Sequence, residues 1–230
     1  MKTIGLLGGM SWESTAGYYR QINEGVKARL GGLHSGKIVL NSVDFAEMEA
    51  LQHRGEWPRI GELLADAARS VEAGGADFLL ICTNTMHKVA EEVATAIDIP
   101  LLHIADATAE TILRKGVKKV GLLGTRFTME QSFYSGRLSE HYGIEVVTPS
   151  QIERERVHNI IYQELCRGEI NAESREIYLH IIDNLSQRGA EAVILGCTEI
   201  GLLVKPEDTD VTLFDTTEIH AQSAVKMALA

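Results

Sequence analysis

Two positions half a chain apart carry side chains that are fit for proton transfer. Thr83 directly follows the apolar run 77–82, and Cys197 follows the apolar run 192–195 and one glycine. A thiol, with an ordinary pKa of about 8.5, becomes a base when it loses its proton. A threonine hydroxyl is far too weak an acid for that role and can only relay or donate a proton. A reaction at two faces of one carbon needs two facing groups, and this pair would be unequal.

Thr83 and Cys197 hold the same place in an internal repeat. Residues 75–85 align without a gap with residues 189–199, at an offset of 114, and residues 2–8 recur as 118–124 at an offset of 116. Apolar strands resemble one another easily, but here the polar residues after the strands match as well. A period near half of the chain predicts two duplicated halves and not a solenoid.

Short apolar strands alternate with longer helical segments along the chain. Such alternation predicts parallel sheets with right-handed crossovers, so the expected fold is α/β, with two pseudo-symmetric parallel-sheet domains. The predicted strands are 3–7, 37–43, 77–82, 101–104, 119–123, 145–148, 192–195 and 211–214. The first predicted helix ends near Leu30, and residues 44–57 are expected to form a loop or a short helix. The remaining predicted helices are 58–72, 87–97, 106–115, 128–142, 152–167, 172–188 and 216–229.

We expect the chain to cross between the halves near Ala105–Asp106. The first domain would be residues 1–104 plus about 211–230, and the second residues 105–210. Ligands of parallel sheets sit beyond the carboxyl ends of the strands. The strand ends at 8–10, 83–85, 124–126 and 197–199 would therefore line one cleft between the two domains.

The turn Gly8-Gly9-Met10-Ser11 leads from a strand into a helix. Free backbone N–H groups and the helix dipole at such a turn can bind a carboxylate or phosphate. The turn lacks the G-x-G-x-x-G dinucleotide pattern. The alternative is a tight turn that binds nothing.

The three cysteines differ in their settings. Adjacent residues of a strand point to opposite sides, so only one of Cys82 and Thr83 should face the cleft, and the repeat selects Thr83. Cys197 could be an ordinary buried thiol, but a glycine precedes it and polar residues follow it. Cys166 lies within a predicted helix, and we interpret it as a structural residue with no part in catalysis. His87, at the start of a helix, could lie near the site or be merely exposed.

Composition excludes several classes of partner. The net charge of −10 argues against nucleic acid or an anionic membrane as the main partner. No apolar run approaches the roughly 20 residues of a membrane-spanning helix. Three cysteines and no signal-peptide pattern fit a reducing cytoplasm. No paired Cys/His spacing suggests a metal site.

Three segments resemble the aspartate/glutamate racemase family over essentially the whole chain. They are 81–87 (Ile-Cys-Thr-Asn-Thr-Met-His), 193–200 (Val-Ile-Leu-Gly-Cys-Thr-Glu-Ile) and the opening turn 8–15. The resemblance implies a cofactor-independent enzyme with two pseudo-symmetric domains and one thiol from each domain flanking the substrate Cα. The family's first signature is Cys-Asn-Thr, so Thr83 stands in the cysteine slot, and the chain resembles a subgroup with a Thr/Cys pair.

The resemblance also implies roles for the neighbouring residues. Backbone N–H groups near Met10 and Ser11 would hold carboxylates, with Asn84, Thr85 and Thr198. Glu199 would take the substrate ammonium group or hold a neighbouring helix end.

The side-chain carboxylate of the substrate is expected near Gln52. Family members often place an arginine near this position, whereas this chain has Met48, Gln52 and, close by, Arg54. An amide in place of a cation would tolerate uncharged side chains, so a broader substrate range is expected.

The sequence therefore predicts an L-aspartate or L-glutamate racemase in which Cys197 removes the Cα proton and the Thr83 side returns one, kinetically biased from L to D. The resemblance implies a cytoplasmic homodimer that binds a small amino acid, with no cofactor and no metal. No exposed apolar stripe in the sequence marks an interface. The alternatives are a non-catalytic amino-acid-binding or regulatory protein on the same scaffold and a related isomerase. Maleate isomerases, hydantoin racemases and malonate decarboxylases share the scaffold, but the Gly8–Ser11 turn and the Cys197-Thr198-Glu199 signature favour amino-acid racemases.

Overall fold

The computed structural model describes residues 1–230 and divides into two compact units. Unit 1 is Met1–Ile104 with His220–Ala230, and unit 2 is Ala105–Ile219. The first crossing lies where the sequence predicts it. The predicted return near residue 211 is wrong, because strand β7 (Thr212–Asp215) pairs with β6 (Ala192–Gly196) and so belongs to unit 2. The chain returns to unit 1 within the last helix, α11 (Thr216–Leu229).

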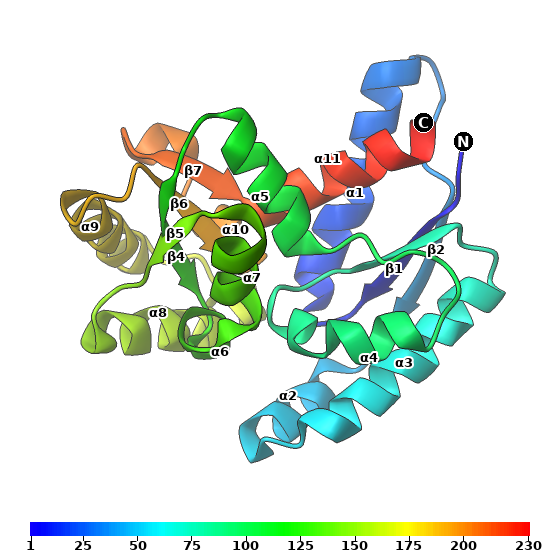
Figure 1. Ribbon diagram of the computed structural model, residues 1–230, viewed down its shortest axis with the longest axis horizontal. Helices are drawn as coiled ribbons and strands as arrows, with labels where there is room; N and C mark the ends of the chain where they lie inside the picture. Colours follow the sequence, from blue (N-terminus) through cyan, green and yellow to red (C-terminus); the bar gives the residue numbers. More distant parts are fainter. The chain divides into compact units, whose positions relative to one another are not determined.

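Unit 1 is built on a three-stranded parallel sheet in the order β2-β1-β3. Its elements are β1 (Ile4–Gly8), α1 (Trp12–Leu30), β2 (Ile38–Ser42), α2 (Phe45–Arg54), α3 (Trp57–Ala73), β3 (Phe78–Ile81), the 3-10 helix η1 (Thr85–Val89), α4 (Ala90–Thr95) and the end of α11 (Figure 1). The strand predicted for 101–104 is a single parallel bridge between Leu79 and Leu101, because α5 (Ile104–Arg114) already begins at Ile104.

Side-chain alternation along the strands gives unit 1 two hydrophobic layers. Ile4 and Leu6 of β1 pack with α1 and α11, through residues such as Tyr18 and Val225. Leu7 packs on the opposite face of the sheet, with α3 and α4. Because helices cover both faces, these strands read as continuous apolar runs, as the sequence shows.

Unit 2 is built on a four-stranded parallel sheet in the order β5-β4-β6-β7. Its further elements are α5, β4 (Lys119–Gly124), α6 (Arg126–Glu130), α7 (Ser132–Tyr142), β5 (Glu145–Val147), α8 (Gln151–Gln163), the 3-10 helix η2 (Leu165–Arg167), α9 (Ala172–Gln187), α10 (Ile200–Leu203) and the 3-10 helix η3 (Pro206–Asp208). Leu123, Val193 and Leu195 pack against α8 and α9 in one hydrophobic cluster.

The two sheets repeat one arrangement. In unit 1, β1 lies between β2 and β3; in unit 2, β4 lies between β5 and β6. Leu101 beside β3 takes the place that β7 takes beside β6. The strand order thus agrees with the duplication inferred from the sequence, and the α/β fold with two parallel sheets is confirmed.

The predicted helix over 128–142 is two helices. Gln131 has extended backbone angles of φ −103° and ψ 150°, which end α6 and serve as the N-cap position of α7. Thr125 caps α6 by accepting a hydrogen bond from the Thr128 N–H.

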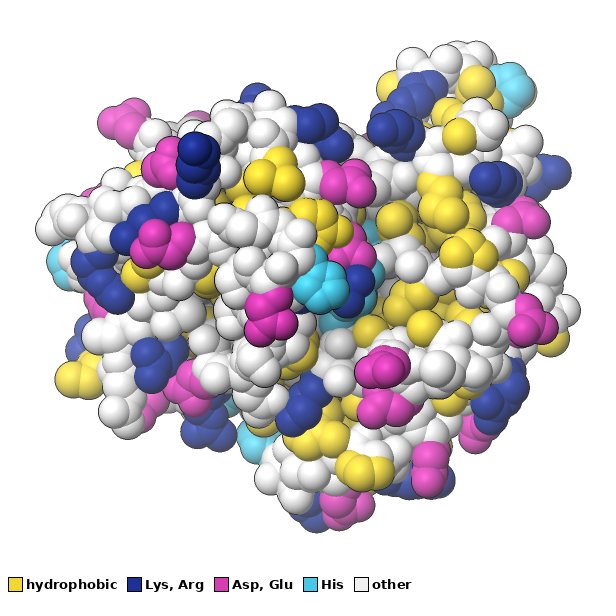
Figure 2. Space-filling model, in the orientation of Figure 1, with side chains coloured by type: hydrophobic (Ala, Val, Ile, Leu, Met, Phe, Trp, Pro, Cys, Tyr) yellow, Lys and Arg dark blue, Asp and Glu magenta, His cyan; other side chains and the backbone are white.

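The surface mixes charges of both signs. On the face shown in Figure 2, acidic and basic side chains are interspersed, so the net charge of −10 does not make this face uniformly acidic. None of the helices combines the length and the apolar character that crossing a membrane requires.

Candidate active site

Unit 2 presents a thiol held by a carboxylate just beyond β6. The Cys197 Sγ donates a hydrogen bond to Glu199 Oε2 at 3.0 Å, and the Thr198 hydroxyl donates to the same oxygen at 2.8 Å. All three residues are buried. Burial raises the pKa of the Cys197 thiol well above its ordinary value, and the negative charge of Glu199 raises it further. The resting group is therefore a neutral thiol.

Two adjacent threonines at the start of α11 support this loop. The Thr216 hydroxyl donates to the Leu195 carbonyl at 2.9 Å, and the Thr217 hydroxyl donates to the Thr198 carbonyl at 3.5 Å. The sequence analysis missed both residues. One feature of the sequence could have identified them: two adjacent hydroxyl residues stand where a predicted strand ends and a predicted helix begins.

The two sheets make Thr83 the counterpart of Cys197. Leu7 of β1 pairs with Ile81, and Leu123 of β4 pairs with Leu195 in the equivalent register. Thr83 lies two residues beyond Ile81, as Cys197 lies two residues beyond Leu195. The register therefore reproduces the alignment made on the sequence.

Cys82 lies on the face of the unit 1 sheet that α1 and α11 cover. It is fully buried in the cluster that includes Tyr18, Ile22 and Leu80 under α1 and α11. Burial raises the pKa of its thiol far above the ordinary value, so Cys82 remains protonated. Cys166, in η2, is half-buried and packs against the hydrophobic cluster of unit 2.

His87 fixes the backbone of the Thr83 loop. Its Nδ1 lies 2.7 Å from the Thr83 carbonyl oxygen, and its Nε2 accepts a hydrogen bond from the Ile104 N–H at 3.2 Å. A neutral ring with its proton on Nδ1 satisfies both bonds. Of the two alternatives for His87, the structure thus supports the buried position beside Thr83, and the ring ties this loop to the start of α5.

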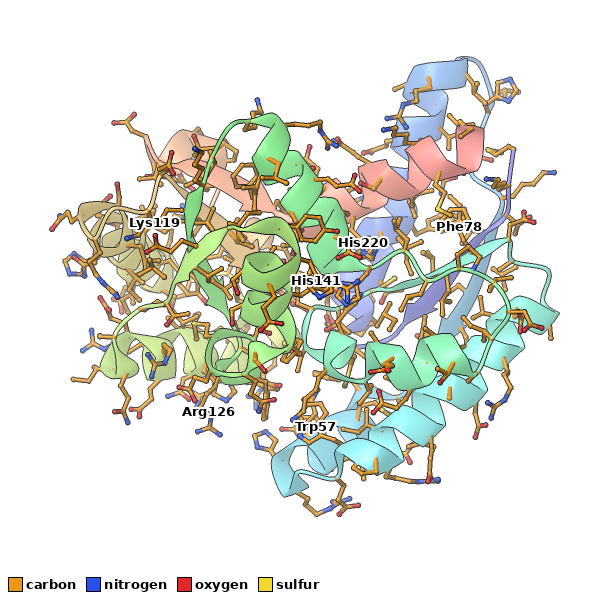
Figure 3. All side chains as sticks on the ribbon, viewed as in Figure 1. Trp57, Phe78, Lys119, Arg126, His141 and His220 are labelled. Atoms are coloured by element: carbon orange, nitrogen blue, oxygen red, sulfur yellow. The ribbon has the colours of Figure 1, made fainter.

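A second buried histidine is His220 of α11, labelled in Figure 3. Its ring centroid lies 6.1 Å from that of His87. Its Nε2 donates to the Leu102 carbonyl at 2.8 Å, and its Nδ1 accepts from the Tyr18 hydroxyl at 2.9 Å. Burial lowers the pKa of His220 to about 4, so the ring is neutral at neutral pH.

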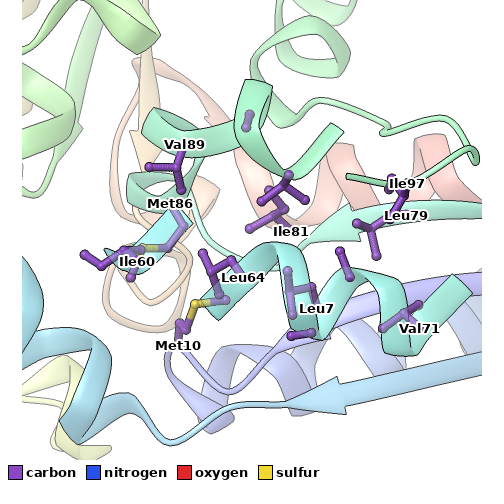
Figure 4. Packing of buried hydrophobic residues seen from close by; sticks show 14 of the residues in the cluster. Leu7, Met10, Ile60, Leu64, Val71, Leu79, Ile81, Met86, Val89 and Ile97 are labelled. Carbon is purple, nitrogen blue, oxygen red and sulfur yellow. The ribbon is translucent and has the colours of Figure 1, made fainter. Parts of the chain in front are cut away.

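Gln52 and three methionines lie together beside the Thr83 loop. The Gln52 amide donates to the Met86 sulfur at 3.5 Å, and Gln52 is 3% exposed. Met10, Met48 and Met86 belong to one hydrophobic cluster, in which Met10 and Met86 flank α3 (Figure 4). The structure therefore brings residues that follow β1 and β3 together with helix α2 within unit 1.

The turn after β1 is closely bonded. The Ser11 hydroxyl caps α1 by accepting from the Ser14 N–H at 3.4 Å, and the Thr15 hydroxyl accepts from the Gly9 N–H at 2.9 Å. Gly9 has φ +92°, and a Cβ there would lie 2.2 Å from the Val43 carbonyl oxygen, so only glycine fits.

Asn84 and Thr85 are both buried at the start of η1. Asn84 occupies the N-cap position, and its side chain does not cap the helix. The His87 N–H donates to the Asn84 carbonyl at 3.1 Å. The structure contains no group of three or more His, Cys, Asp or Glu side chains that could hold a metal ion.

Known proteins resemble this chain in sequence and in fold. The model of the family described as Asp/Glu/hydantoin racemase matches residues 7–224. The chain belongs to the Asp/Glu/hydantoin racemase family. Family and fold together support an amino-acid racemase, which is an isomerase.

Individual relatives cover the chain nearly end to end. It is 56% identical to a Yersinia pestis protein assigned to the Asp/Glu racemases, with both chains covered in full and a TM-score of 0.93. It is 36% identical to an aspartate racemase homologue from Pyrococcus horikoshii OT3, again with both chains fully covered and a TM-score of 0.86. It is 23% identical to the broad specificity amino-acid racemase RacX of Bacillus subtilis (strain 168), over 99% of this chain and 98% of that protein.

Proposed function

We propose that the protein is a cofactor-independent racemase of L-aspartate and L-glutamate, in which Cys197 removes the Cα proton and the Thr83 side protonates the opposite face. The observation that carries this proposal is the equivalence of Thr83 and Cys197 at the ends of two related strands. The two strand ends would face each other across one substrate. We further propose that the protein works in the cytoplasm as a homodimer, as the family resemblance implies.

The barrier to removing a Cα proton must fall through fixed donors and a dry site. Asn84, Thr85 and Thr198 are buried polar groups beside the proposed proton donor and base. Together with the backbone N–H groups at Met10 and Ser11, they are suited to hold the α-carboxylate and its developing negative charge.

Glu199 would couple substrate binding to thiol ionisation. In the resting site its carboxylate keeps the Cys197 proton in place, since it accepts the thiol hydrogen bond and adds negative charge. A substrate ammonium group bound at Glu199 would neutralise that charge. The thiol could then release its proton to water only when an amino acid is present, and this proton balances the one that Thr83 later takes back from water.

The proton balance makes the two directions unequal. The thiolate takes the Cα proton of the L-isomer, and the carbanion takes a proton from the Thr83 hydroxyl, which recovers one from water. In reverse, Thr83 would have to act as the base, which a hydroxyl does poorly. Because racemisation has an equilibrium constant of one, kcat/KM must be the same for the two enantiomers, so the bias can lie only in kcat and KM taken separately.

With Gln52 in the proposed substrate pocket, the substrate would not need an acidic side chain. The nearby Arg54 is half exposed and bonds Glu56, so its charge is engaged outside the Gln52–Met86 contact. A neutral amide among methionines would tolerate uncharged side chains, in keeping with the broad specificity of the Bacillus subtilis relative.

The test is proton NMR of L-glutamate and L-aspartate in deuterium oxide, followed by chiral analysis. We expect loss of the Cα signal with the native protein and with Cys166→Ala, the matched thiol control. Cys197→Ala should exchange about 10³-fold more slowly. No exchange by the native protein with any L-amino acid would instead favour the non-catalytic amino-acid-binding protein.

A further inference from the structure

Two adjacent hydroxyl groups at the start of α11 hold the backbone on either side of Cys197. The Thr216 hydroxyl donates to the Leu195 carbonyl at 2.9 Å, two residues before the thiol. The Thr217 hydroxyl donates to the Thr198 carbonyl at 3.5 Å, one residue after it. Both threonines are buried, so the two bonds are shielded from water. The loop that carries the thiol is thus fixed by α11 as well as by its own strand.

The bond to Thr198 acts on the peptide group that lies next to the sulfur. The Thr198 carbonyl and the Glu199 N–H belong to one peptide group, which is planar, so fixing the carbonyl also fixes the direction of the N–H. Burial and the Glu199 carboxylate raise the pKa of the Cys197 thiol, whereas a hydrogen bond from the Glu199 backbone lowers it. That N–H therefore stabilises the thiolate, the form that the proposed base needs.

The start of α11 is itself held in place. Oδ1 of Asp215 accepts the N–H groups of Thr217 and Glu218 at 2.8 and 3.2 Å, which caps the helix. Gly201 lies in α10, the helix that follows the Cys197 loop. A Cβ at Gly201 would collide with Oδ2 of Asp215. The cap of α11 and the helix after the loop are therefore packed directly against each other.

The bond from Thr217 to Thr198 is long in the resting site for a physical reason. Burial raises the pKa of Asp215, and hydrogen bonds from the start of α11, with the Thr217 hydroxyl among the donors, lower it. The single hydroxyl proton thus has two acceptors, the Asp215 carboxylate and the Thr198 carbonyl. When Cys197 ionises, the peptide N–H faces a full negative charge, and the polarised carbonyl becomes a stronger acceptor than before. The Thr217 bond should then shorten.

We propose that Thr217 is a positioning residue for the proposed base. Its hydroxyl acts through the peptide group between Thr198 and Glu199, keeps the N–H of that group directed at the sulfur of Cys197, and so stabilises the thiolate. Thr216 has a different task, since it holds the end of β6 and not this peptide group. The inference rests on the proposed function, in which Cys197 is the base.

The other titratable groups around the thiol stay the same when Thr217 is changed. Glu199, on the same loop, and Cys166, in η2, both act on the pKa of Cys197. Burial raises the pKa of Tyr178, in α9, and the nearby Cys197 raises it further. A variant of Thr217 leaves all of these side chains in the protein. A change in the ionisation of Cys197 in such a variant therefore reports the bond that the substitution removes.

The experiment is alkylation of Cys197 by iodoacetamide without substrate, at neutral and mildly alkaline pH, followed by mass spectrometry of the labelled peptide. Thr217→Val keeps the branched side chain and removes the hydroxyl. It should be alkylated about 3- to 10-fold more slowly than the native protein, as expected for the loss of one neutral hydrogen bond. Thr217→Ser should restore the native rate to within about twofold. Thr216→Val should change the rate by less than about twofold, because the peptide group beside the sulfur keeps its bond.

Thr111→Val is the matched control. It removes a hydroxyl-to-carbonyl bond of 2.9 Å within α5, also in unit 2, and should be alkylated at the native rate. Urea unfolding checks the fold of each variant, and Thr217→Ala repeats the comparison where Thr217→Val does not fold. Alkylation needs no substrate, so it tests Thr217 even where the native protein racemises no amino acid, a result that would defeat only the proposed function.

Kinetics with L-glutamate give the second readout. Thr217→Val should lower kcat about tenfold and leave KM within about twofold, because the groups proposed to bind the substrate are unchanged. Thr217→Ser should recover kcat. Native alkylation in Thr217→Val, no recovery in Thr217→Ser, equal slowing in Thr216→Val or Thr111→Val, or a change confined to KM would each overturn the proposal.

Discussion

The end of β3 in unit 1 and the end of β6 in unit 2 have equivalent registers but are held in different ways. The Thr83 loop is held through its backbone, by the His87 ring on its carbonyl. The Cys197 loop is held through its reactive side chain, by Glu199. In the proposed mechanism, one duplicated element thus carries two kinds of proton chemistry. The weakly acidic hydroxyl would need only to be positioned, whereas the thiol would also have to be kept protonated until substrate arrives.

Removing the Thr83 hydroxyl should separate the two half-reactions. Thr83→Ala should lower racemisation of L-glutamate by about 100-fold or more, because the proton donor on its side is lost. Exchange of the L-isomer Cα proton through Cys197 should persist with retention of configuration. Deuterium NMR and chiral chromatography of one sample measure both. A Thr83→Ala enzyme of full activity would end the assignment of Thr83.

Removing the charge of Glu199 should change the thiol and the reaction in opposite ways. Glu199→Gln lowers the pKa of Cys197, since the negative charge that raises it is gone. Alkylation of Cys197 by iodoacetamide at neutral pH, without substrate, should become faster. The value of kcat/KM should nevertheless fall roughly 10- to 100-fold, because a charged hydrogen bond to the ammonium group is lost.

Unchanged alkylation in Glu199→Gln would show that burial alone sets the state of the thiol. Undiminished kcat/KM would remove Glu199 from substrate binding. Glu191→Gln, an exposed carboxylate at the other end of β6, provides the control.

Making the two strand ends alike should remove the bias between enantiomers. Thr83→Cys places a thiol on both sides, so the ratio of initial rates from L- and D-glutamate should move toward one. Initial rates at saturating concentrations of each pure enantiomer, followed by polarimetry, test this. Comparable L and D rates already in the native protein would contradict the proposed inequality, and Cys82→Ala should leave the native ratio unchanged, because that thiol faces the core.

Acid should weaken unit 1 through His220, with no effect on activity at neutral pH. The pKa of His220 is about 4 in the folded chain against 6.5 as its ordinary value. As pH falls through this window the unfolded chain binds a proton that the native ring refuses, so the free energy of unfolding drops by about 3 kcal/mol. Above pH 6.5 both states are neutral and nothing is lost.

His220→Gln should reduce the drop in the free energy of unfolding between pH 7.5 and 4.5. Urea unfolding followed by circular dichroism at these two pH values would measure it. The exposed His141→Gln should keep the native pH dependence. An equal slope in native protein and His220→Gln would assign the acid sensitivity to other groups.

The sequence predicts the duplicated fold well because buried strands and glycine turns leave local patterns. The alignment of residues 75–85 with 189–199 reappears in the strand register. What it misses depends on partners distant in the chain. The return to unit 1 near Ile219 is hidden inside a continuous helix, and the break at Gln131 has no glycine or proline to mark it.

The hydrogen bonds around the candidate site residues could not be predicted from the sequence. The position of Cys197 followed from the repeat, whereas its bond to Glu199 depends on rotamers two residues apart, which no pattern encodes. His87 was undecided for a similar reason. Both of its ring nitrogens bond backbone atoms, and one of them belongs to Ile104, well beyond its own helix.

The discontinuous build of unit 1 bears on the order in which the chain folds during synthesis. Residues 105–219 leave the ribosome as one uninterrupted stretch that contains all of unit 2. The hydrophobic layer under α1 in unit 1 is complete only when Ala221, Ala224 and Val225 have been synthesised, and so is the hydrogen bond between His220 and Tyr18. The half of the molecule that begins translation is therefore the half that finishes folding last, so the thiol side is in place before the hydroxyl side acquires its full support.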